Sequence, residues 1–258
     1  MAASVIDSIL FGGLFGSGRM RALFEERALL QRWLDYAAAL ARAQATLGLV
    51  PPEAAAEITR QARAEHFDLA TLREGIDRTV HPLVPLIWQL GERCEGDAGR
   101  WVHWGATTQD VMDTATILQL RDALALNEET TADLAGTLAD LTRRYRNTPM
   151  AGRTHGQQAL PITFGFKVAG WLAELNRHRQ RLVRAREQAL VGQFGGAVGT
   201  LAGMAEGSVD ALAVHRALMA ELGLGVPSIA WHSSRDIPVE CAVAMGMVGA
   251  LCGRIAKE

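Results

Sequence analysis

One unusually long stretch of helical periodicity constrains the fold of this chain more than any other feature. Apolar residues recur at the spacing of an amphipathic helix from residue 109 to about residue 146, where Asn147-Thr148-Pro149 ends the pattern. A helix of this length spans roughly 50 Å at about 1.5 Å per residue. A second long pattern covers residues 161–191. Helices longer than those of most globular domains predict a long helical bundle.

Shorter helical patterns surround these two stretches, whereas strand patterns are nearly absent. We therefore expect an all-α fold, with an N-terminal helical domain over residues 1–108 and the first part of a central long-helix bundle over residues 109–258. The last pattern reaches Lys257-Glu258 without a capping glycine or proline, so we expect the fold to be truncated before its C-terminal part. The shorter helices are expected at residues 25–47, 52–64, 82–93 and 239–258.

Composition favours a soluble globular protein with a small-molecule partner. The 258 residues are 49% hydrophobic and 21% charged, and the formal net charge of −2 provides no field that would recruit nucleic acid or an anionic membrane. No signal peptide and no apolar run of about 18 or more residues stands out, so we expect a cytoplasmic protein with no membrane span. The three cysteines, Cys94, Cys241 and Cys252, lack metal-ligand spacing and are expected to be reduced and mostly buried.

The polar connector at residues 153–158 contains the leading acid/base candidate, His155. The connector combines a cation, a hydroxyl, an imidazole and two amides, directly before the helix expected at Pro161. Imidazole is the side chain whose ordinary pKa, near 6.5, suits proton transfer around neutral pH. The alternative is a loop histidine that hydrogen-bonds a neighbouring backbone group.

Two further histidines lie close to expected helix starts. His81 directly precedes a helix N-terminus, where backbone N–H groups favour an anion, although a capping or packing role is the more common one. His103 lies between Trp101 and Trp104, which indicates a buried histidine with satisfied hydrogen bonds.

Hydroxyl and amide groups open the longest helix at residues 107–110. This geometry can hold a carboxylate without a metal, although an ordinary helix cap has the same composition. Residues 233–235 could also hold a carboxylate, because Arg235 can bind one through two N–H groups. No metal site, nucleophile elbow or dinucleotide fingerprint is present, so no cofactor is expected. A β-elimination next to a carboxylate needs such donors, because they stabilise the doubly charged aci-carboxylate intermediate.

Several blocks together resemble the fumarase/aspartase superfamily. Residues 105–110 are similar to its first signature region and residues 152–159 to its second, while residues 193–200 and Arg235-Asp236 with Glu240 resemble later blocks. The resemblance covers nearly the whole chain and is strongest to the branch that contains adenylosuccinate lyase and 3-carboxy-cis,cis-muconate cycloisomerase. It implies a homotetramer in which each active site is assembled from three subunits.

The resemblance also implies roles for individual residues. His155 would be the general acid or its relay, and His81 the second active-site histidine. A serine that the family places in a later loop, and that is thought to act as the base, lies beyond this sequence. The residues expected to bind substrate are Thr107, Thr108, Gln109, Arg153, Thr154, Gln158, Ser233, Ser234 and Arg235.

Features within the family favour a lyase that acts on a small polycarboxylate and releases a fumarate-type product. The purine enzymes carry an Arg-Tyr pair near the N-terminus, whereas residues 11–17 here read Phe-Gly-Gly-Leu-Phe-Gly-Ser. Residues 193–196 and Trp231-His232 are more similar to the lactone-forming cycloisomerase, but His155 is typical of the lyases. The cycloisomerase is therefore the first alternative, and adenylosuccinate lyase or an inactive helical scaffold are further ones.

Overall fold

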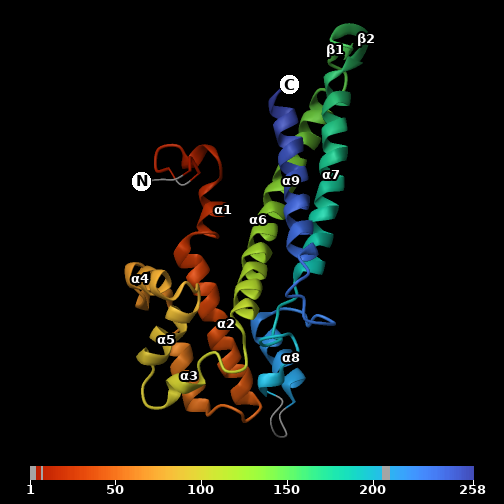
Figure 1. The fold of residues 1–258 in the computed structure, drawn as a ribbon. Coiled ribbons are helices and arrows are strands. Elements are labelled where there is room, and N and C mark those ends of the chain that lie inside the picture. The colour runs from red at the N-terminus through yellow and green to blue at the C-terminus, as the bar shows by residue number, and fades with distance from the viewer. Residues whose placement is uncertain (1–3, 7, 205–209) are drawn as a thin grey trace. The chain divides into compact units, whose positions relative to one another are not determined.

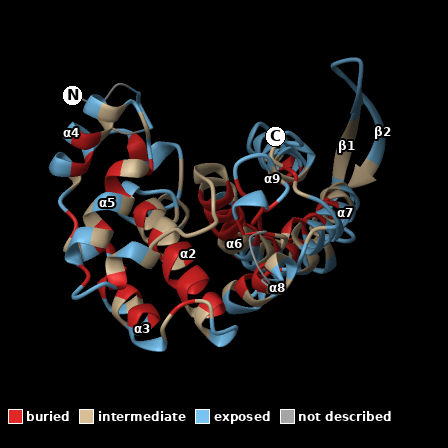
Figure 2. Ribbon diagram, turned by 60° about the horizontal axis from the view of Figure 1, so that its bottom comes forward, coloured by how far each residue is buried: buried red, intermediate tan, exposed pale blue. Residues whose placement is uncertain are grey.

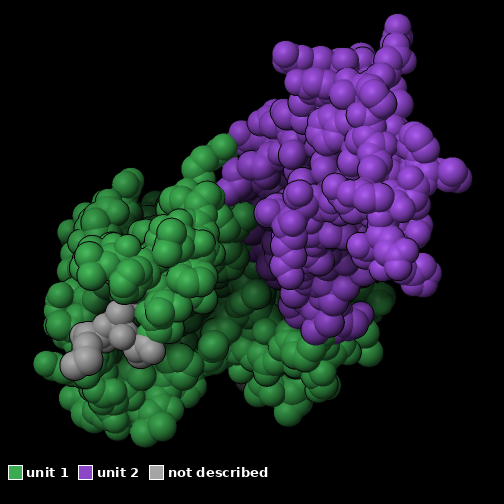
Figure 3. Space-filling view, turned by 90° about the horizontal axis from the view of Figure 1, so that it is seen from above, with its two compact units in different colours: residues 1–119, 190–235 green, residues 120–189, 236–258 purple. Residues whose placement is uncertain are grey.

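The computed structural model describes residues 4–6, 8–204 and 210–258, which form two compact units (Figure 3). Unit 1 contains the chain up to Gln119 together with Leu190–Arg235, and unit 2 contains Leu120–Ala189 and Asp236–Glu258. The all-α prediction is confirmed, because 67% of the described residues are helical. The change from unit 1 to unit 2 falls within the longest helix, after Gln119. The domain boundary expected after residue 108 stays a prediction.

Unit 1 is built from short and medium helices around one long one. The helices expected near residues 25, 52 and 82 are present, whereas α4 and α8 were not expected. Both of these helices are capped by an aspartate, Asp68 or Asp210, whose side chain accepts a backbone N–H three residues later. The helices are α1 (Gly18–Ala22), α2 (Glu26–Thr46), α3 (Pro52–Gln61), α4 (Leu69–Thr79), α5 (Val84–Arg93), the first part of α6 (Thr108–Arg144) and α8 (Ala211–Leu222), with short 3-10 segments at Gly12–Leu14, Ala64–His66, Ala98–Trp101 and Ala202–Met204.

The core of unit 1 is centred on α2. Leu34, Tyr36 and Leu40 are at most 1% exposed, and Figure 2 shows buried residues along most of this helix. Both α3 and α8 pack against α2. The buried positions of α2 include Ala37, Ala38, Ala39, Ala41 and Ala43, whose small side chains let neighbouring helices approach closely from more than one side.

Unit 2 is a bundle of long helices with a β-hairpin. Its helices are the rest of α6, α7 (Phe164–Ala189) and α9 (Asp236–Ala256), which lie side by side in Figure 1. Leu138 of α6, Leu175 of α7 and Leu251 of α9 belong to one buried cluster. The long helices predicted from residues 109 and 161 are therefore present, with their apolar faces buried against one another.

The hairpin that joins α6 to α7 is the main correction to the predicted secondary structure. Strands β1 (Pro149–Thr154) and β2 (Gln157–Thr163) pair antiparallel, so α7 begins at Phe164 and not at Pro161. Pro161 lies opposite Ala151, beside a register irregularity between Ala151 and Arg153, which is where a strand tolerates proline. Strands this short give no clear period-two signal, which is why the sequence pattern around Pro161 predicts a helix instead.

Helix α9 also corrects an expectation about apolar runs. Its sequence is long and apolar enough to cross a membrane by length and composition, with a mean hydropathy of 1.5 over a window of which 22% is buried in the structure. It is the single helix of this kind among the described residues. A core helix of a soluble protein passes the same test, so this feature alone is weak evidence for a membrane span.

The cysteines match the predicted reduced state. Cys94, Cys241 and Cys252 are all free thiols, of which the first two are buried and Cys252 is exposed. Burial is the main cause that raises the pKa of Cys94 to about 11, so this thiol stays protonated and unreactive around neutral pH.

Candidate functional site

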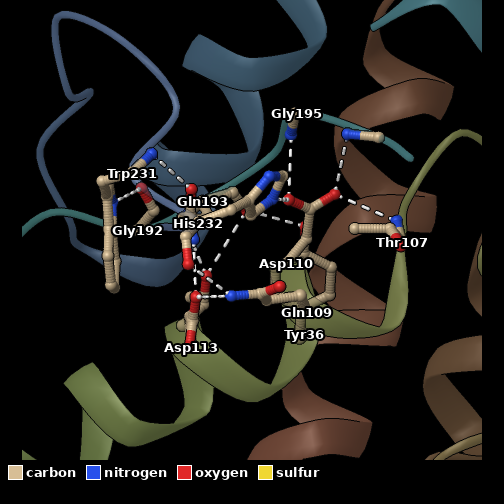
Figure 4. A network of polar contacts seen from close by, with 12 residues as sticks. Tyr36, Thr107, Gln109, Asp110, Asp113, Gly192, Gln193, Gly195, Trp231 and His232 are labelled. Atoms are coloured by element: carbon tan, nitrogen blue, oxygen red, sulfur yellow. Dashed lines mark hydrogen bonds and ion pairs between the residues drawn. The ribbon is translucent and has the colours of Figure 1, made fainter. Parts of the chain in front are cut away.

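A buried carboxylate, Asp110, organises the start of α6. Its side chain is fully buried, and its Oδ2 atom accepts the backbone N–H groups of Thr107 and Gly196, each at 3.0 Å (Figure 4). The Oδ1 atom accepts the N–H of Gly195, also at 3.0 Å. Because α6 begins at Thr108, Thr107 directly precedes the helix, and the Asp110 side chain reaches back to accept its backbone N–H. One aspartate thus joins the helix start to the loop at residues 195–196.

The fourth partner of Asp110 is the imidazole of His232. Its Nε2 atom lies 2.7 Å from Oδ1 of Asp110, and the His232 side chain is 17% exposed while that of Asp110 is fully buried. The backbone carbonyl of His232 accepts a hydrogen bond from Nε2 of Gln109 at 2.6 Å. Side chain and backbone of His232 are therefore both held by the first turn of α6, as Figure 4 shows.

A second acidic residue of α6, Asp113, lies one turn further on and accepts hydrogen bonds from three side chains. Gln193 donates to it from Nε2 at 2.7 Å, and Gln109 donates at 3.3 Å. Arg235 donates from Nη1 at 3.1 Å, and its guanidinium lies 5.2 Å from the centre of the Trp231 ring. The amide of Gln109 and the cation of Arg235, both expected to bind substrate, thus already hold partners from their own chain.

Gln193 ties this region to the core of unit 1. The hydroxyl of Tyr36 donates to the Gln193 carbonyl at 2.8 Å, and the Gln193 backbone N–H donates to Oγ1 of Thr114 at 2.8 Å. Its side-chain carbonyl accepts the backbone N–H of Trp231 at 2.8 Å. Burial, followed by the charge of Asp110, raises the pKa of Tyr36, so its hydroxyl remains a donor. The backbone and side-chain polar groups of Gln193 thus all have hydrogen-bond partners, which connect the start of α6 to α2 and to Trp231.

His81 precedes α5, as the sequence predicted, and its ring caps that helix. Its Nδ1 atom accepts the N–H of Val84 at 3.2 Å and that of Leu83 at 3.4 Å. An acceptor Nδ1 leaves the hydrogen of the neutral ring on Nε2, which lies 3.4 Å from Oγ1 of Thr108. Val80, directly before His81, has a left-handed φ of 52°, which strains a β-branched residue. His81 and Thr108, two predicted site residues, thus lie together in unit 1.

His103 differs from the prediction that its buried ring nitrogens would all have hydrogen-bond partners. Its Nδ1 atom is buried and has no hydrogen-bond partner among the described residues. Burial lowers the pKa of its imidazole, while the nearby charge of Asp110 opposes this shift and His81 adds to it. A neutral histidine with an unpaired nitrogen therefore lies within the electrostatic range of Asp110 and His81.

The remaining histidine candidate, His155, lies at the tip of the hairpin in unit 2. His155 and Gly156 form the two-residue turn between Thr154 and Gln157, with φ values of 52° and 72°. Two successive positive φ values are typical of the turns that favour tight hairpins. His155 is exposed, and its ring has no hydrogen-bond partner among the described residues, so it does not bond a neighbouring backbone group. The other exposed candidates on the hairpin are Arg153, Thr154 and Gln158.

The predicted site residues are thus divided between unit 1 and unit 2. Unit 1 holds the α6 start with His81 and the connector with Arg235, where Ser233 and Ser234 are exposed. Among the described residues, no group of three or more histidine, cysteine or acidic side chains is arranged to hold a metal ion. No role was predicted from the sequence for Asp110, Asp113, Gln193 or His232. The one local signal was an acidic residue three positions after Thr107, which is the spacing of a helix capping box.

Comparison with known proteins identifies the family. A family model described as lyase matches residues 16–258. The chain belongs to this lyase family. Its membership in the fumarase/aspartase superfamily, inferred above from the motifs, is thereby confirmed.

Several relatives of this lyase family align along almost the whole chain. A 3-carboxy-cis,cis-muconate cycloisomerase of Pseudomonas aeruginosa is 46% identical over 96% of this chain and 54% of its own length. An N-acetyl-S-(2-succino)cysteine lyase of Enterococcus italicus is 42% identical over 100% of this chain and 56% of its own length. The chain therefore spans about half the length of these relatives.

A solved structure confirms the fold class. The crystal structure of the 3-carboxy-cis,cis-muconate lactonizing enzyme from Pseudomonas putida superposes with a TM-score of 0.93 at 43% sequence identity. The alignment covers 97% of this chain and 57% of that one. The long-helix architecture is thus that of a lyase-family protein.

Proposed function

We propose that this protein is a lyase that eliminates a group from a small polycarboxylate and releases a fumarate-type product. Membership in the lyase family, with relatives named as lyases or cycloisomerases along the whole chain, carries the proposal. The chemistry requires loss of a β-proton and stabilisation of the resulting doubly charged aci-carboxylate by fixed donors. The start of α6 offers hydroxyls and amides for this purpose.

Residue roles follow the motifs. The hydroxyls of Thr107 and Thr108 bind a substrate carboxylate at the start of α6, with His81 beside Thr108 as the second active-site histidine. His155, exposed at the hairpin turn, supplies the leaving group with a proton. The further substrate-binding residues of the proposal are Gln109, Arg153, Thr154, Gln158, Ser233, Ser234 and Arg235. No cofactor takes part in this mechanism.

Assembly is part of the proposal. The active site combines residues from different subunits of a homotetramer, so His155 of one subunit serves residues of the α6 start in another. The large apolar side chains that α9 exposes, including Val239, Val243 and Met247, are consistent with burial in such an assembly. We place the protein in the cytoplasm, with no nucleic-acid or membrane partner.

A second candidate is the lactone-forming 3-carboxy-cis,cis-muconate cycloisomerase. A protein of this name matches at 46% identity in sequence, and a lactonizing enzyme matches at a TM-score of 0.93 in structure. The exposed His155 favours the lyase, because that chemistry needs a proton donor for the leaving group.

One set of assays separates these functions. The purified protein is offered succinyl adducts such as N-acetyl-S-(2-succino)cysteine, then fumarate with amines, then 3-carboxymuconate, and ultraviolet absorbance is followed. Appearance of fumarate from a succinyl adduct is the expected result. Loss of the conjugated diene with lactone formation assigns the cycloisomerase instead. Absence of turnover on all three would reject both and leave the inactive scaffold.

A further inference from the structure

We propose that Trp231 is a positioning residue for substrate binding, which holds the guanidinium of Arg235 in one orientation for a substrate carboxylate. The inference rests on the proposed function, in which Arg235 binds substrate. Its starting observation is a cation–π contact, in which the Cζ atom of Arg235 lies over the Trp231 ring at 5.2 Å from the ring centre. Among the aromatic side chains, tryptophan forms the strongest contacts of this kind.

Arg235 retains N–H groups that are available to a ligand. Its Nη1 atom donates to Asp113, whereas Nη2 and Nε have no hydrogen-bond partner among the described residues. The side chain is 44% exposed, so a ligand can reach these groups. Nε and Nη2 form one edge of the planar guanidinium, and two parallel N–H groups on such an edge match the two oxygens of a carboxylate. This edge of Arg235 therefore fits a substrate carboxylate.

The indole ring adds a restraint that Asp113 alone does not provide. A guanidinium that is held at a single nitrogen can swing about that contact. A ring face under Cζ limits this motion, so the edge formed by Nε and Nη2 keeps one direction. A guanidinium that is already oriented binds a carboxylate more tightly, because it loses less conformational freedom on binding.

Trp231 can hold Arg235 because its own position is fixed. It is 6% exposed, and its indole Nε1 atom donates to the Gly192 carbonyl at 3.2 Å (Figure 4). Its backbone N–H donates to Oε1 of Gln193 at 2.8 Å. Gly192 in turn packs closely on α8, because a Cβ atom at this position would lie only 2.5 Å from Sδ of Met219. The indole ring is thus anchored in the packed core of unit 1.

A buried tryptophan can also serve only to fill a core, and the two roles differ in one consequence. A positioning residue acts through Arg235, so its removal weakens carboxylate binding only while that arginine is present. A residue that only fills the core acts independently of Arg235, and the two substitutions then have additive effects.

A double-mutant cycle in the full chain separates these roles. Isothermal titration calorimetry with succinate, a dicarboxylate without a leaving group, measures binding without turnover. We expect Trp231→Leu to raise the Kd by about four- to tenfold, and Trp231→Phe, which retains an aromatic face, to raise it by at most about twofold. In a chain that carries Arg235→Gln, the added Trp231→Leu change should alter the Kd by less than about twofold.

The matched control is Trp33→Leu, which removes an indole from α2 in the same unit and should leave the Kd for succinate unchanged. Steady-state kinetics provide a second readout. Trp231→Leu should raise KM while kcat stays within about twofold of the wild type, because the ring acts on carboxylate binding and not on proton transfer. Should Trp231→Leu fail to fold, Trp231→Met, which fills more of the space without a ring, takes its place.

Three results would overturn the inference. They are a wild-type chain that does not bind succinate, a Trp231→Leu chain with the wild-type Kd, and an equal loss of binding from Trp231→Leu with and without Arg235. The proposed function fails separately. A wild type that binds succinate with the expected dependence on Trp231 and Arg235, but turns over none of the three substrates, would reject the lyase and retain the inference.

Discussion

Arg235 donates from Nη1 to both carboxylate oxygens of Asp113, at 3.1 and 3.3 Å, although 122 positions separate the two residues in the sequence. The cation that the motifs assign to a substrate carboxylate therefore already binds a carboxylate of its own chain. A substrate must compete with Asp113 for this guanidinium or use its remaining N–H groups.

Substitution of Asp113 by asparagine should release Arg235 for substrate. We expect KM for a polycarboxylate to fall by about two- to tenfold, which corresponds to roughly 0.4–1.4 kcal/mol of competing interaction. Asparagine retains an acceptor for Gln193, so the free energy of unfolding should fall by no more than about 1 kcal/mol. Steady-state kinetics and urea unfolding measure the two effects. Asp77→Asn, which removes an exposed partner of Arg73, is the control, and an unchanged KM in Asp113→Asn would show that Arg235 does not bind substrate.

Removal of the Asp110 carboxylate should destabilise unit 1 strongly. Asp110→Ala leaves the N–H groups of Thr107, Gly195 and Gly196 without their acceptor, and we expect the free energy of unfolding to fall by about 3–5 kcal/mol. The comparison is Asp210→Ala, which removes an exposed helix cap and should cost about 1 kcal/mol. Denaturant unfolding of the two variants provides the test. Equal losses would mean that Asp110 acts as an ordinary cap.

His155 can be tested without disturbing the hairpin. Asparagine tolerates the left-handed conformation that His155 adopts and is favoured in turns of this kind, so His155→Asn should leave Tm within a few degrees of the wild type. If the imidazole is the acid, kcat should fall by about 10²- to 10⁴-fold. His178→Asn, on α7 of the same unit, provides a histidine control outside the proposed site. Turnover at the wild-type rate in His155→Asn would remove this residue from the mechanism.

Val80 stores backbone strain directly before His81. It is 89% exposed and has a φ of 52°, so glycine at this position relieves the strain and loses little packing. We expect Val80→Gly to raise the free energy of unfolding by about 1 kcal/mol, as measured with urea. Val198→Gly, at an exposed valine for which no positive φ is found, should not stabilise the protein. Loss of stability in Val80→Gly would indicate that the valine side chain makes a contact that exceeds the strain.

Acidification should destabilise the fold through the buried His215 and the half-buried His103. Burial is the largest cause that lowers the pKa of both His103 and His215, so below the unfolded pKa the unfolded chain binds more protons than the folded one. Their stabilising effect is present above the unfolded value, near 6.5, and is lost as pH falls from there towards the lower folded values. Each group contributes a slope of at most about 1.4 kcal/mol per pH unit. Unfolding measured from pH 7.5 to 5 should show this decline, and His215→Leu should make it shallower. A decline of equal slope in His215→Leu would exclude His215 as a source.

Local patterns in the sequence determined the helical architecture and the family. The period of apolar residues in α2, α6 and α7 depends on neighbours three and four positions away, so it can be read from the chain itself. The same holds for the position of His81 before a helix. The signature blocks at residues 105–110 and 152–159 carried the family for the same reason, because each is a short contiguous string.

Tertiary structure alone decided which polar groups meet. Asp110 finds Gly195 and His232 across 85 and 122 positions, and no periodicity within one segment encodes such a distance. The hairpin around His155 was missed because its strands are short and its pairing depends on a turn of two positive φ values. Packing of helices on the apolar face of α2 and hydrogen bonding to buried carboxylates, which cannot remain unpaired, bring the distant connectors of unit 1 together.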